Sequence, residues 1–395
     1  MHILYSSVLC SDKVTTYLSS VLGYPVQGVA VHRFHEMIVR GFVLNDCIVT
    51  TISNPPMLFK GREMYQCFKT ETIGNVTYSY CPRLRLPIIK HFVTAFVAFV
   101  KSVKWCLKQK KNESVIICDV LNVSASLGSL LAGKLWNIKV VCIVTDLPDS
   151  PGFAAHPTFM QKLVSRINSA ILYRYDAYVL LTETMNTIVN PHHRPHIVME
   201  GVAEAEPCTE HKIAPKMRKI VYAGSIHEQF GIKRLMLAFQ LLPHRDIQLC
   251  IYGMGNMSEE MAKYEEADSR LHYYGLVSND EIKIIEHEAY LLVNPRPTDA
   301  AYTRYSFPSK NMEYMASGTP LLTTRLAGIP QEYYDFIYTL DDESVDGIYA
   351  TLNNLLNAPA QELIDKGLAA QTYVLKYKNN IYQTKRILKS LCAYE

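Results

Sequence analysis

Short runs of apolar residues, each followed by a polar loop and a stretch with helical spacing, recur along the chain. Runs of this length are typical of strands that are buried on both faces of a parallel sheet. Their alternation with helical stretches predicts parallel, doubly wound α/β sheets. The predicted strands are Met1–Tyr5, Cys47–Ile52, Val115–Cys118, Val140–Val144, Ala177–Leu181, Ile220–Ala223, Gln248–Tyr252, His272–Tyr274, Ala289–Val293 and Leu321-Leu322.

The length of the chain indicates two domains. A chain of 395 residues, 49% of them apolar, is too long for a single core. A polar, proline-bearing stretch near the middle is the expected linker. The predicted organisation is a first domain at 1–202, a linker at 203–217, a second domain at 218–376 and a final lysine-bearing helix at 377–395.

Charge is shared unevenly between the two halves. Residues 1–200 contain 20 Lys and Arg against 12 Asp and Glu, which gives +8, and the remainder contains 20 against 25, which gives −5. A basic half joined to an acidic half suggests that one domain faces a negatively charged surface. Ten cysteines without CxxC spacing, and no secretory signal before them, predict reduced thiols in a cytoplasmic protein.

The segment Arg83–Lys111 concentrates the basic charge of the first half. No acidic residue lies between Glu71 and Glu113. Helical spacing puts Phe92, Phe96, Phe99, Val103 and Leu107 on one face, with Lys101, Lys104 and Lys108 opposite and Trp105 among these lysines. The apolar part is far shorter than the roughly 20 residues that span a bilayer. Two interpretations stay open, a helix that lies on anionic lipid and an ordinary packing helix with a fringe of solvated lysines.

The stretch from Asn294 to Pro320 carries the main candidate site. An apolar strand ends at Asn294-Pro295-Arg296, and a short helix is predicted to start near Pro308, because proline is tolerated in a first helical turn. Gly318 fits a left-handed helix terminus, and Pro320 prevents continuation. The order is therefore strand, long polar loop, short helix, strand.

Lys310 is unexpected in the first turn of this helix, because the helix dipole favours anions there. An anion such as phosphate, held between the lysine and the free N–H groups, would explain it. Glu313, three residues further on, shares its face. The simpler alternative is an ordinary surface pair between Lys310 and Glu313.

These residues resemble the nucleotide-sugar site of GT-B glycosyltransferases of the group 1 family (glycosyltransferase family 4), and more closely its bacterial exopolysaccharide and capsule branch. In that branch a segment SFPSK-x-x-E-Y-x-A-S-G-T-P follows an N-P-R strand end. Here the matching residues are Asn294–Arg296, Ser306–Lys310, Glu313-Tyr314 and Ala316–Pro320. The resemblance covers most of 220–338 and, more weakly, the N-terminal half. It implies a GT-B fold, in which two Rossmann-like domains face a cleft and the last helix crosses back to the first domain.

The resemblance also implies which residues bind the nucleotide sugar. Glu313 would take the ribose hydroxyls, and the turn at Gly275 and Leu276 would hold the base through main-chain groups. The chain departs from the family at Ser225 and Phe230, where relatives have an arginine and a lysine, and at Tyr305, where relatives have a first glutamate. The residues assigned to the donor site are Gly224, Ser225, Lys233, Gly275, Leu276, Arg296, Phe307, Ser309, Lys310 and Glu313.

Further candidates come from other strand ends. Asp146 follows the buried run Val140–Val144, where parallel sheets place ligands, and in the relatives this loop lines the cleft; capping of a turn is the alternative role. His156 is a weaker candidate, and Arg33, Phe34 and His35 are assigned to an exposed helix face. The motif Gly253-Met254-Gly255 lacks the third glycine and the acidic partner of a dinucleotide fingerprint, so that reading is rejected.

The expected activity is transfer of a sugar from a nucleoside-diphosphate donor, UDP being favoured, to an acceptor hydroxyl, with Asp146 and Lys310 as catalytic residues. The resemblance implies retention of anomeric configuration. No metal is expected, because N–H groups and the Lys310 ammonium would stabilise the departing diphosphate and no DxD-type carboxylate pair is placed to hold one. No cofactor is expected besides the donor as co-substrate. The expected partners are a lipid-linked or saccharide acceptor and an anionic membrane surface on the inner face of the cell membrane, with no nucleic acid. A nucleotide-sugar 2-epimerase and a non-catalytic partner subunit are the alternatives.

Overall fold

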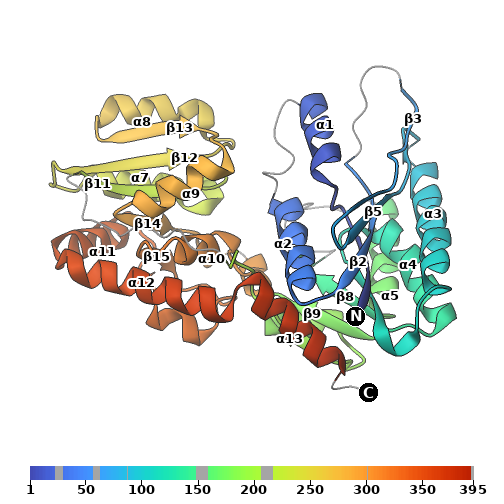
Figure 1. Cartoon of the computed structure of the whole chain (residues 1–395). Coiled ribbons are helices and arrows are strands. Elements are labelled where there is room, and N and C mark those ends of the chain that lie inside the picture. Colours follow the sequence, from blue (N-terminus) through green and yellow to red (C-terminus); the bar gives the residue numbers. More distant parts are fainter. Residues whose placement is uncertain are drawn as a thin grey trace. The chain divides into compact units, whose positions relative to one another are not determined.

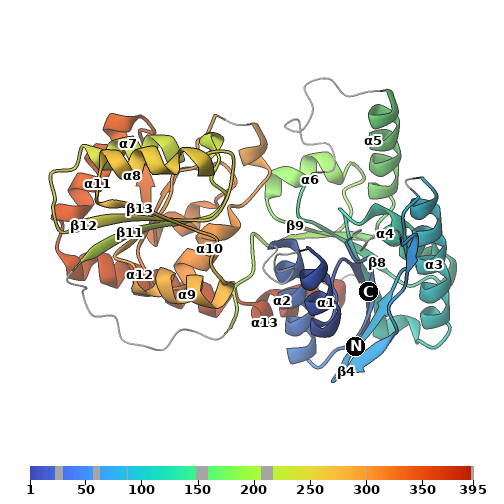
Figure 2. The same cartoon turned by 90° about the horizontal axis from the view of Figure 1, so that it is seen from above.

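The computed structural model describes residues 1–22, 30–56, 63–86, 88–147, 159–205, 217–299 and 301–392. The chain divides into two compact units, shown in Figure 1 and, from above, in Figure 2. Unit 1 comprises Met1–Val202 together with Asn380–Glu395, and unit 2 comprises Ala203–Asn379. Each unit is an α/β structure built on a mainly parallel sheet, as the alternation of strands and helices predicted.

Unit 1 contains an eight-stranded sheet in the order β10-β9-β8-β7-β1-β2-β5-β4. All neighbours are parallel except β4 and β5, which form a hairpin. The central strands are buried along most of their length, which explains their continuous apolar sequences. The strands of this sheet are β1 (His2–Ser7), β2 (Ile48–Ser53), β4 (Glu71–Ile73), β5 (Val76–Tyr80), β7 (Ser114–Asp119), β8 (Val140–Val144), β9 (Ala177–Leu180) and β10 (His196–Val198).

The last helix of the chain is part of the unit 1 core. Ile387 and Leu391 of α13 pack with Ile38 and Phe42 of α2 in one buried cluster. The helices of unit 1 are α1 (Asp12–Leu22), α2 (Ala30–Leu44), α3 (Ile89–Cys106), α4 (Val123–Trp136), α5 (Phe159–Leu172), α6 (Glu183–Val189) and α13 (Asn380–Cys392). Polar contacts reinforce this packing, since Asn45 Nδ2 donates to Ile381 O at 2.9 Å and to Thr384 Oγ1 at 3.0 Å.

The orientation of α3 differs from that of an ordinary amphipathic packing helix. Its buried face consists of Thr94, Ala98, Ser102, Trp105 and Cys106. In the stripe predicted from helical spacing, Phe92, Phe96 and Leu107 face outward, whereas Phe99 and Val103 are half-buried. The reason is close helix packing. A Cβ at Gly128 of α4 would lie 2.2 Å from Ala95 O and 2.6 Å from Phe99 N, so α4 approaches the backbone of α3 directly at this turn.

One expectation about this segment was wrong. Trp105 does not stand among solvated lysines but is buried against unit 1. Arg83, at the start of the basic segment, is also buried, where β3 (Tyr65–Gln66) pairs with β6 (Arg83–Leu84) in a separate two-stranded antiparallel sheet. No helix in the described ranges is both long and apolar enough to span a bilayer.

Unit 2 contains a fully parallel six-stranded sheet in the order β13-β12-β11-β14-β15-β16. Two clusters of buried apolar side chains cover its faces. The strands are β11 (Arg218–Ala223), β12 (Ile247–Tyr252), β13 (Leu271–Gly275), β14 (Leu291–Asn294), β15 (Leu321–Thr324) and β16 (Tyr338–Leu340). The helices are α7 (Ile232–Gln240), α8 (Met261–Ala267), α9 (Asn279–Glu288), α10 (Ser309–Ala316), α11 (Val345–Asn357) and α12 (Ala360–Tyr377).

Candidate functional site

The strand order of unit 2 has a topological switch point between β11 and β14, where a parallel sheet is expected to bind a ligand. From β11 the chain continues outward through β12 and β13, and it then returns to the other side of β11 to build β14, β15 and β16. At such a topological switch point the loops after the two neighbouring strands diverge and leave a crevice at their carboxyl ends. These loops are Gly224-Ser225 after β11 and Pro295-Arg296 after β14.

Helix α10 is attached to this edge of the sheet by buried hydrogen bonds. The Ala223 N–H donates to Tyr314 Oη at 2.7 Å, and the Tyr314 hydroxyl donates to Ala223 O at 3.0 Å. Asn294 Nδ2 donates to Asn311 Oδ1 at 2.7 Å. Because Ala223 and Asn294 are the last residues of β11 and β14, α10 is held directly at the switch point.

The start of α10 lies at the surface of this crevice edge. Pro308 is the N-cap residue, one position before the helix and not within its first turn as predicted, and no described side chain caps it by a hydrogen bond. Ser309, the first helical residue, is exposed. The first N–H groups of a helix have no intrahelical acceptor, and they attract anions. At the other end, Gly318 has φ +75°, which confirms the predicted left-handed terminus.

Lys310 lies between two carboxylates. Its Nζ donates to Glu313 Oε2 at 2.7 Å and lies 3.8 Å from Oε1 of Glu286, a residue of α9. The Lys310 side chain is 35% exposed, whereas that of Glu286 is only 3% exposed. The predicted pair of Lys310 and Glu313 is therefore present. An exposed surface pair contributes only about 0–1 kcal/mol to stability. The pair of Lys310 and Glu313 differs from such a pair because the buried carboxylate of Glu286 also lies near the lysine.

Three glycines bring the ends of β11, β12 and β13 close together. The Gly224 N–H donates to Tyr252 O at 3.0 Å, and the Gly253 N–H donates to Gly275 O at 2.7 Å. Gly253 has φ +129°, and a Cβ on it would lie 1.8 Å from Gly224 O. The motif rejected as a dinucleotide fingerprint thus supports the Gly224 loop through backbone contact.

Several predicted donor residues lie at the same carboxyl edge of the sheet. Ser225 and Leu276 are exposed, and Gly275 is half-buried with φ +67°. Arg296 is half-buried, with its guanidinium carbon 4.8 Å from the centre of the Phe230 ring. These residues follow β11, β13 and β14, so the fold brings their main chains to one edge.

Two predicted residues have other contacts. Phe307 is buried, with its ring 5.2 Å from that of Tyr333, so its side chain belongs to the core and only its main chain adjoins the helix start. The exposed Lys233 Nζ donates to Glu228 Oε1 at 3.1 Å. This hydrogen bond raises the pKa of Lys233, and the pair lies at the start of α7.

Asp146 and His156 were the site candidates predicted at the carboxyl edge of the unit 1 sheet. Asp146 is exposed in the loop after β8, and His156 lies outside the described residues.

The prediction that His35 is exposed was wrong. Its Nδ1 is 2.8 Å from the Tyr5 hydroxyl and its Nε2 is 3.3 Å from Asp119 Oδ2, with the His35 and Asp119 side chains fully buried. Burial is also the main cause of a strongly raised Tyr5 pKa.

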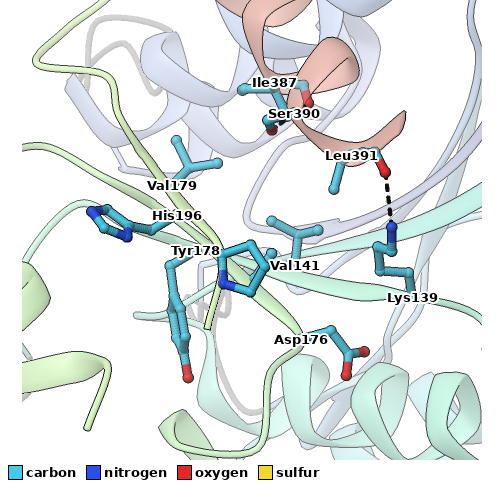
Figure 3. A pocket seen from close by; sticks show the side chains of 11 residues that line it. Lys139, Val141, Asp176, Tyr178, Val179, His196, Ile387, Ser390 and Leu391 are labelled. Atoms are coloured by element: carbon cyan, nitrogen blue, oxygen red, sulfur yellow. Dashed lines mark hydrogen bonds between the residues drawn. The ribbon is translucent and has the colours of Figure 1, made fainter. Parts of the chain in front are cut away.

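A small pocket in unit 1 lies at the opposite edge of its sheet (Figure 3). Lys139, Asp176 and Pro195 line it, and they precede β8, β9 and β10, so it opens at the amino ends of these strands. Lys139 Nζ donates to Leu391 O at 2.8 Å near the end of α13, where the helix dipole favours a cation. The pocket therefore lies where the end of α13 packs against the sheet, and we assign it a structural role. In the described part of the chain, no three His, Cys, Asp or Glu residues form a group that could hold a metal ion.

Sequence reasoning missed the residues that position α10. Asn311 and Tyr314 were within the recognised motif, and a polar side chain on the buried face of a short helix is the signal that could have found them. Glu286 is 24 residues away from Lys310 in sequence, and only tertiary packing brings the two together.

We expect Tyr314→Phe to destabilise unit 2 by about 1–3 kcal/mol, because it leaves buried main-chain groups of Ala223 without their hydroxyl partner. The measurement is the free energy of unfolding in urea. Tyr349→Phe, at a half-buried tyrosine of α11, is the control and should change stability by less than about 0.5 kcal/mol. Equal effects of the two substitutions would contradict the positioning role of the Tyr314 hydroxyl.

Comparison with known proteins agrees with this geometry. Residues 217–358 match the family described as Glycosyl transferases group 1. No curated protein sequence matches the chain significantly. The 142 matched residues (358 minus 217, plus one) lie wholly in unit 2 and contain every residue assigned to the donor site.

Solved structures of similar fold cover the whole chain. Sucrose-phosphate synthase from Thermosynechococcus elongatus matches with a TM-score of 0.68 at 12% identity, over 100% of both chains. Anabaena HepE, solved in complex with UDP, matches with a TM-score of 0.63 at 10% identity, again over 100% of both. The lipopolysaccharide outer core galactosyltransferase WaaB matches with a TM-score of 0.59 at 14% identity and the same coverage. These likenesses confirm the GT-B fold, while membership of family 4 and of its capsule branch stays a prediction.

Proposed function

We propose that this chain, a glycosyltransferase of GT-B fold, transfers a sugar from a UDP-linked donor to the hydroxyl group of a lipid-linked glycan. The class of enzyme is the premise, since residues 217–358 match a glycosyltransferase family. The observation that carries the proposal is the position of Lys310 at the uncapped start of α10, beside the switch point of the unit 2 sheet.

The diphosphate of the donor would lie against the start of α10. The N–H groups of the first helical turn and the Lys310 ammonium both favour an anion there. The Gly224 loop can approach closely, because neither Gly224 nor Gly253 carries a side chain. Lys310 Nζ donates to Glu313 Oε2 at 2.7 Å. We infer that the ammonium turns from Glu313 to the phosphate, which releases the Glu313 carboxylate to accept hydrogen bonds from the ribose hydroxyls.

The base would lie at the turn after β13. Gly275 and the exposed Leu276 follow the strand next to β12, so their main-chain groups can bind the base of a nucleotide whose diphosphate lies at β11. UDP is chosen as the nucleotide because HepE, a structural neighbour, was solved with UDP. Ser225, Ser309 and Arg296 would complete the diphosphate and sugar contacts, with Lys233 as an outer positive charge.

The chemistry is stabilisation of a leaving group. As the bond between the sugar and the diphosphate breaks, negative charge grows on the diphosphate, and preorganised N–H groups and one ammonium stabilise it. In the proposed mechanism these groups act without a metal, the acceptor attacks from the face that the diphosphate leaves, and the anomeric configuration is retained. Asp146 of unit 1 is proposed to orient the acceptor hydroxyl.

The acceptor is proposed to be a lipid-linked saccharide in surface polysaccharide synthesis, used at the inner face of the cell membrane. Two observations support this. The first 200 residues carry a net charge of +8, which favours an anionic surface. The neighbour WaaB is a galactosyltransferase of the lipopolysaccharide outer core.

The proposal is tested by measuring protection from thermal unfolding with UDP, GDP, ADP and their sugar conjugates. We expect UDP compounds to stabilise the chain, by about 2.7 kcal/mol at a ligand concentration 100 times Kd. No protection by any nucleotide would favour a non-catalytic partner subunit. Consumption of donor without acceptor and with inversion at C2 would favour a 2-epimerase.

Two further measurements test the finer parts of the proposal. Proton NMR of the first product should show the anomeric configuration of the donor sugar. Transfer should continue at an unchanged rate in EDTA. An inverted product, or loss of activity restored by a divalent cation, would contradict the retaining or the metal-independent mechanism respectively.

A further inference from the structure

The outer face of α3 is apolar and aromatic, and no described element covers it. Ile88, Phe92 and Phe96 are 71%, 72% and 67% exposed. We call the exposed set the α3 aromatic face; it consists of Ile88, Ile89, Phe92, Phe96 and Leu107. Isolated exposed apolar residues are normal on a protein, but a continuous row of them along one helix marks an interaction surface.

This face does not result from poor packing of α3. The opposite side of the helix packs tightly on α4, where Ser102 Oγ donates to Ser129 Oγ at 3.1 Å. Figure 1 shows α3 and α4 side by side at the outside of unit 1. The core is therefore complete without the phenylalanines, and their exposure needs a separate reason.

Neighbouring segments extend the apolar surface at the start of α3. Leu86 is exposed just before the helix, and the Arg85 N–H donates to Met64 O at 3.1 Å, which places the exposed Met64 and Tyr65 next to it. The surface therefore spans the β3–β6 strand pair and the helix. A patch formed by two separate elements is larger than one helix stripe alone.

The charges around the face are mostly positive; the exceptions are Glu63, next to Met64, and Glu113, which lies 3.4 Å from Lys110. Residues 72–112 contain no Asp or Glu and eight Lys or Arg. Two of the eight point elsewhere, since Arg83 is buried and Lys101 Nζ donates to Ser79 Oγ at 2.7 Å. Six remain, among them the exposed Lys104 in the last turn of α3 and the exposed Lys108 just after the helix.

We propose that the α3 aromatic face docks on the headgroup layer of an anionic membrane, with Phe92 and Phe96 inserted and the flanking lysines on lipid phosphates. Apolar and aromatic side chains on one face of a helix with lysines at its border suit this layer. A soluble protein partner would need acidic groups around an apolar groove, whereas an anionic bilayer presents both features everywhere. The inference rests on the proposed function, because it explains how a lipid-linked acceptor would be reached.

The position of the face in unit 1 agrees with that use. The chain reaches α3 from the carboxyl end of β5, which is parallel to β2 and β1. The apolar start of α3 therefore lies at the same sheet edge as the loops after β1 and β8, and Asp146 is in the latter loop. Docking at this end would bring the proposed acceptor edge toward the lipid.

The test is co-sedimentation of the full chain with vesicles of phosphatidylcholine, alone or mixed with phosphatidylglycerol. We expect binding to the mixed vesicles and little to the neutral ones. Phe92→Ser/Phe96→Ser should weaken binding at least about tenfold. Lys104→Gln/Lys108→Gln should weaken it about 30-fold, at roughly 1 kcal/mol for each charge. The matched control, Leu241→Ser/Ile284→Ser, removes two similarly exposed apolar residues of unit 2 and should bind as the unmodified chain does.

The outcomes separate this inference from the proposed function. UDP protection from thermal unfolding should be the same in Phe92→Ser/Phe96→Ser and the unmodified chain, because neither residue belongs to the donor site. Vesicle binding without any nucleotide protection would support docking and overturn the function. Nucleotide protection without vesicle binding would overturn docking. A dimer that the same double substitution converts to a monomer, without vesicle binding, would also overturn it and assign the face to a second copy.

Discussion

Lys310→Ala lowers the turnover of sugar transfer by about 10²–10³-fold, the loss typical of removing one preorganised group that stabilises charge in a transition state. The ammonium lies at the start of α10 and is the positive charge proposed to take the place of the arginine and lysine that relatives have near Ser225 and Phe230. Turnover is measured with saturating donor, and donor affinity separately by calorimetry with UDP.

Three variants make this result specific. Lys310→Arg keeps a positive charge and should recover part of the rate. Lys283→Ala, which removes an exposed ion pair with Glu204 at 2.6 Å, should leave the rate unchanged. Lys310→Ala/Glu286→Gln also removes the buried carboxylate beside the lysine, and recovery of the rate in this variant would mean that Lys310 only balances Glu286. A near-normal rate and UDP affinity in Lys310→Ala itself would refute the assignment of the site.

Gly253→Ala destabilises unit 2 by about 2–4 kcal/mol and abolishes detectable UDP binding. A φ of +129° is rarely adopted by residues other than glycine, and the new Cβ would lie 1.8 Å from Gly224 O. Because both contacting groups are backbone, the Gly224 loop must move, and the overpacking adds to the conformational cost. Urea unfolding and calorimetry with UDP measure the two effects.

The matched control for this substitution is Gly275→Ala. Gly275 also has a positive φ, +67°, but a Cβ there would meet no atom within 4 Å, so the expected cost is only about 1 kcal/mol. A Gly253→Ala variant that is no less stable than Gly275→Ala, or that still binds UDP, would show that close approach of these two loops is not needed.

The local pattern of residues in the sequence was sufficient to predict the strands and the helix of unit 2 around the site. Strand β14, the helix after Pro308 and strand β15 were all predicted from apolar runs, a proline near a helix start and a glycine at the helix end. The structure places that glycine, Gly318, at φ +75°. The pair of Lys310 and Glu313 followed from helical spacing alone. The contact between Lys310 and Glu286 could not be predicted in this way, because Glu286 belongs to α9, an earlier helix of the chain. Tyr314 was recognised as part of a motif, but its hydrogen bonds to Ala223 were not predicted.

Local pattern was misleading where packing used small residues. The phenylalanine row of α3 has the spacing of a packing face, yet Ala98, Ser102 and Trp105 are buried in its place, because Gly128 lets α4 approach that side. His35 was likewise expected at the surface and is buried beside Asp119, since the position of α2 on the sheet is decided by contacts with Tyr5 and α13.

The sequence by itself determined the alternation of strands and helices, the two-unit organisation expected from the length, and the start of a short helix directly after Pro308. These depend on hydrogen bonds and apolar spacing within a few residues. Only the tertiary structure decided which face of α3 is exposed, which carboxylate lies beneath Lys310 and which glycine supports the Gly224 loop. Those features depend on contacts between segments that are far apart in the chain. The order of the strands and the distance at which helices pack determine these contacts.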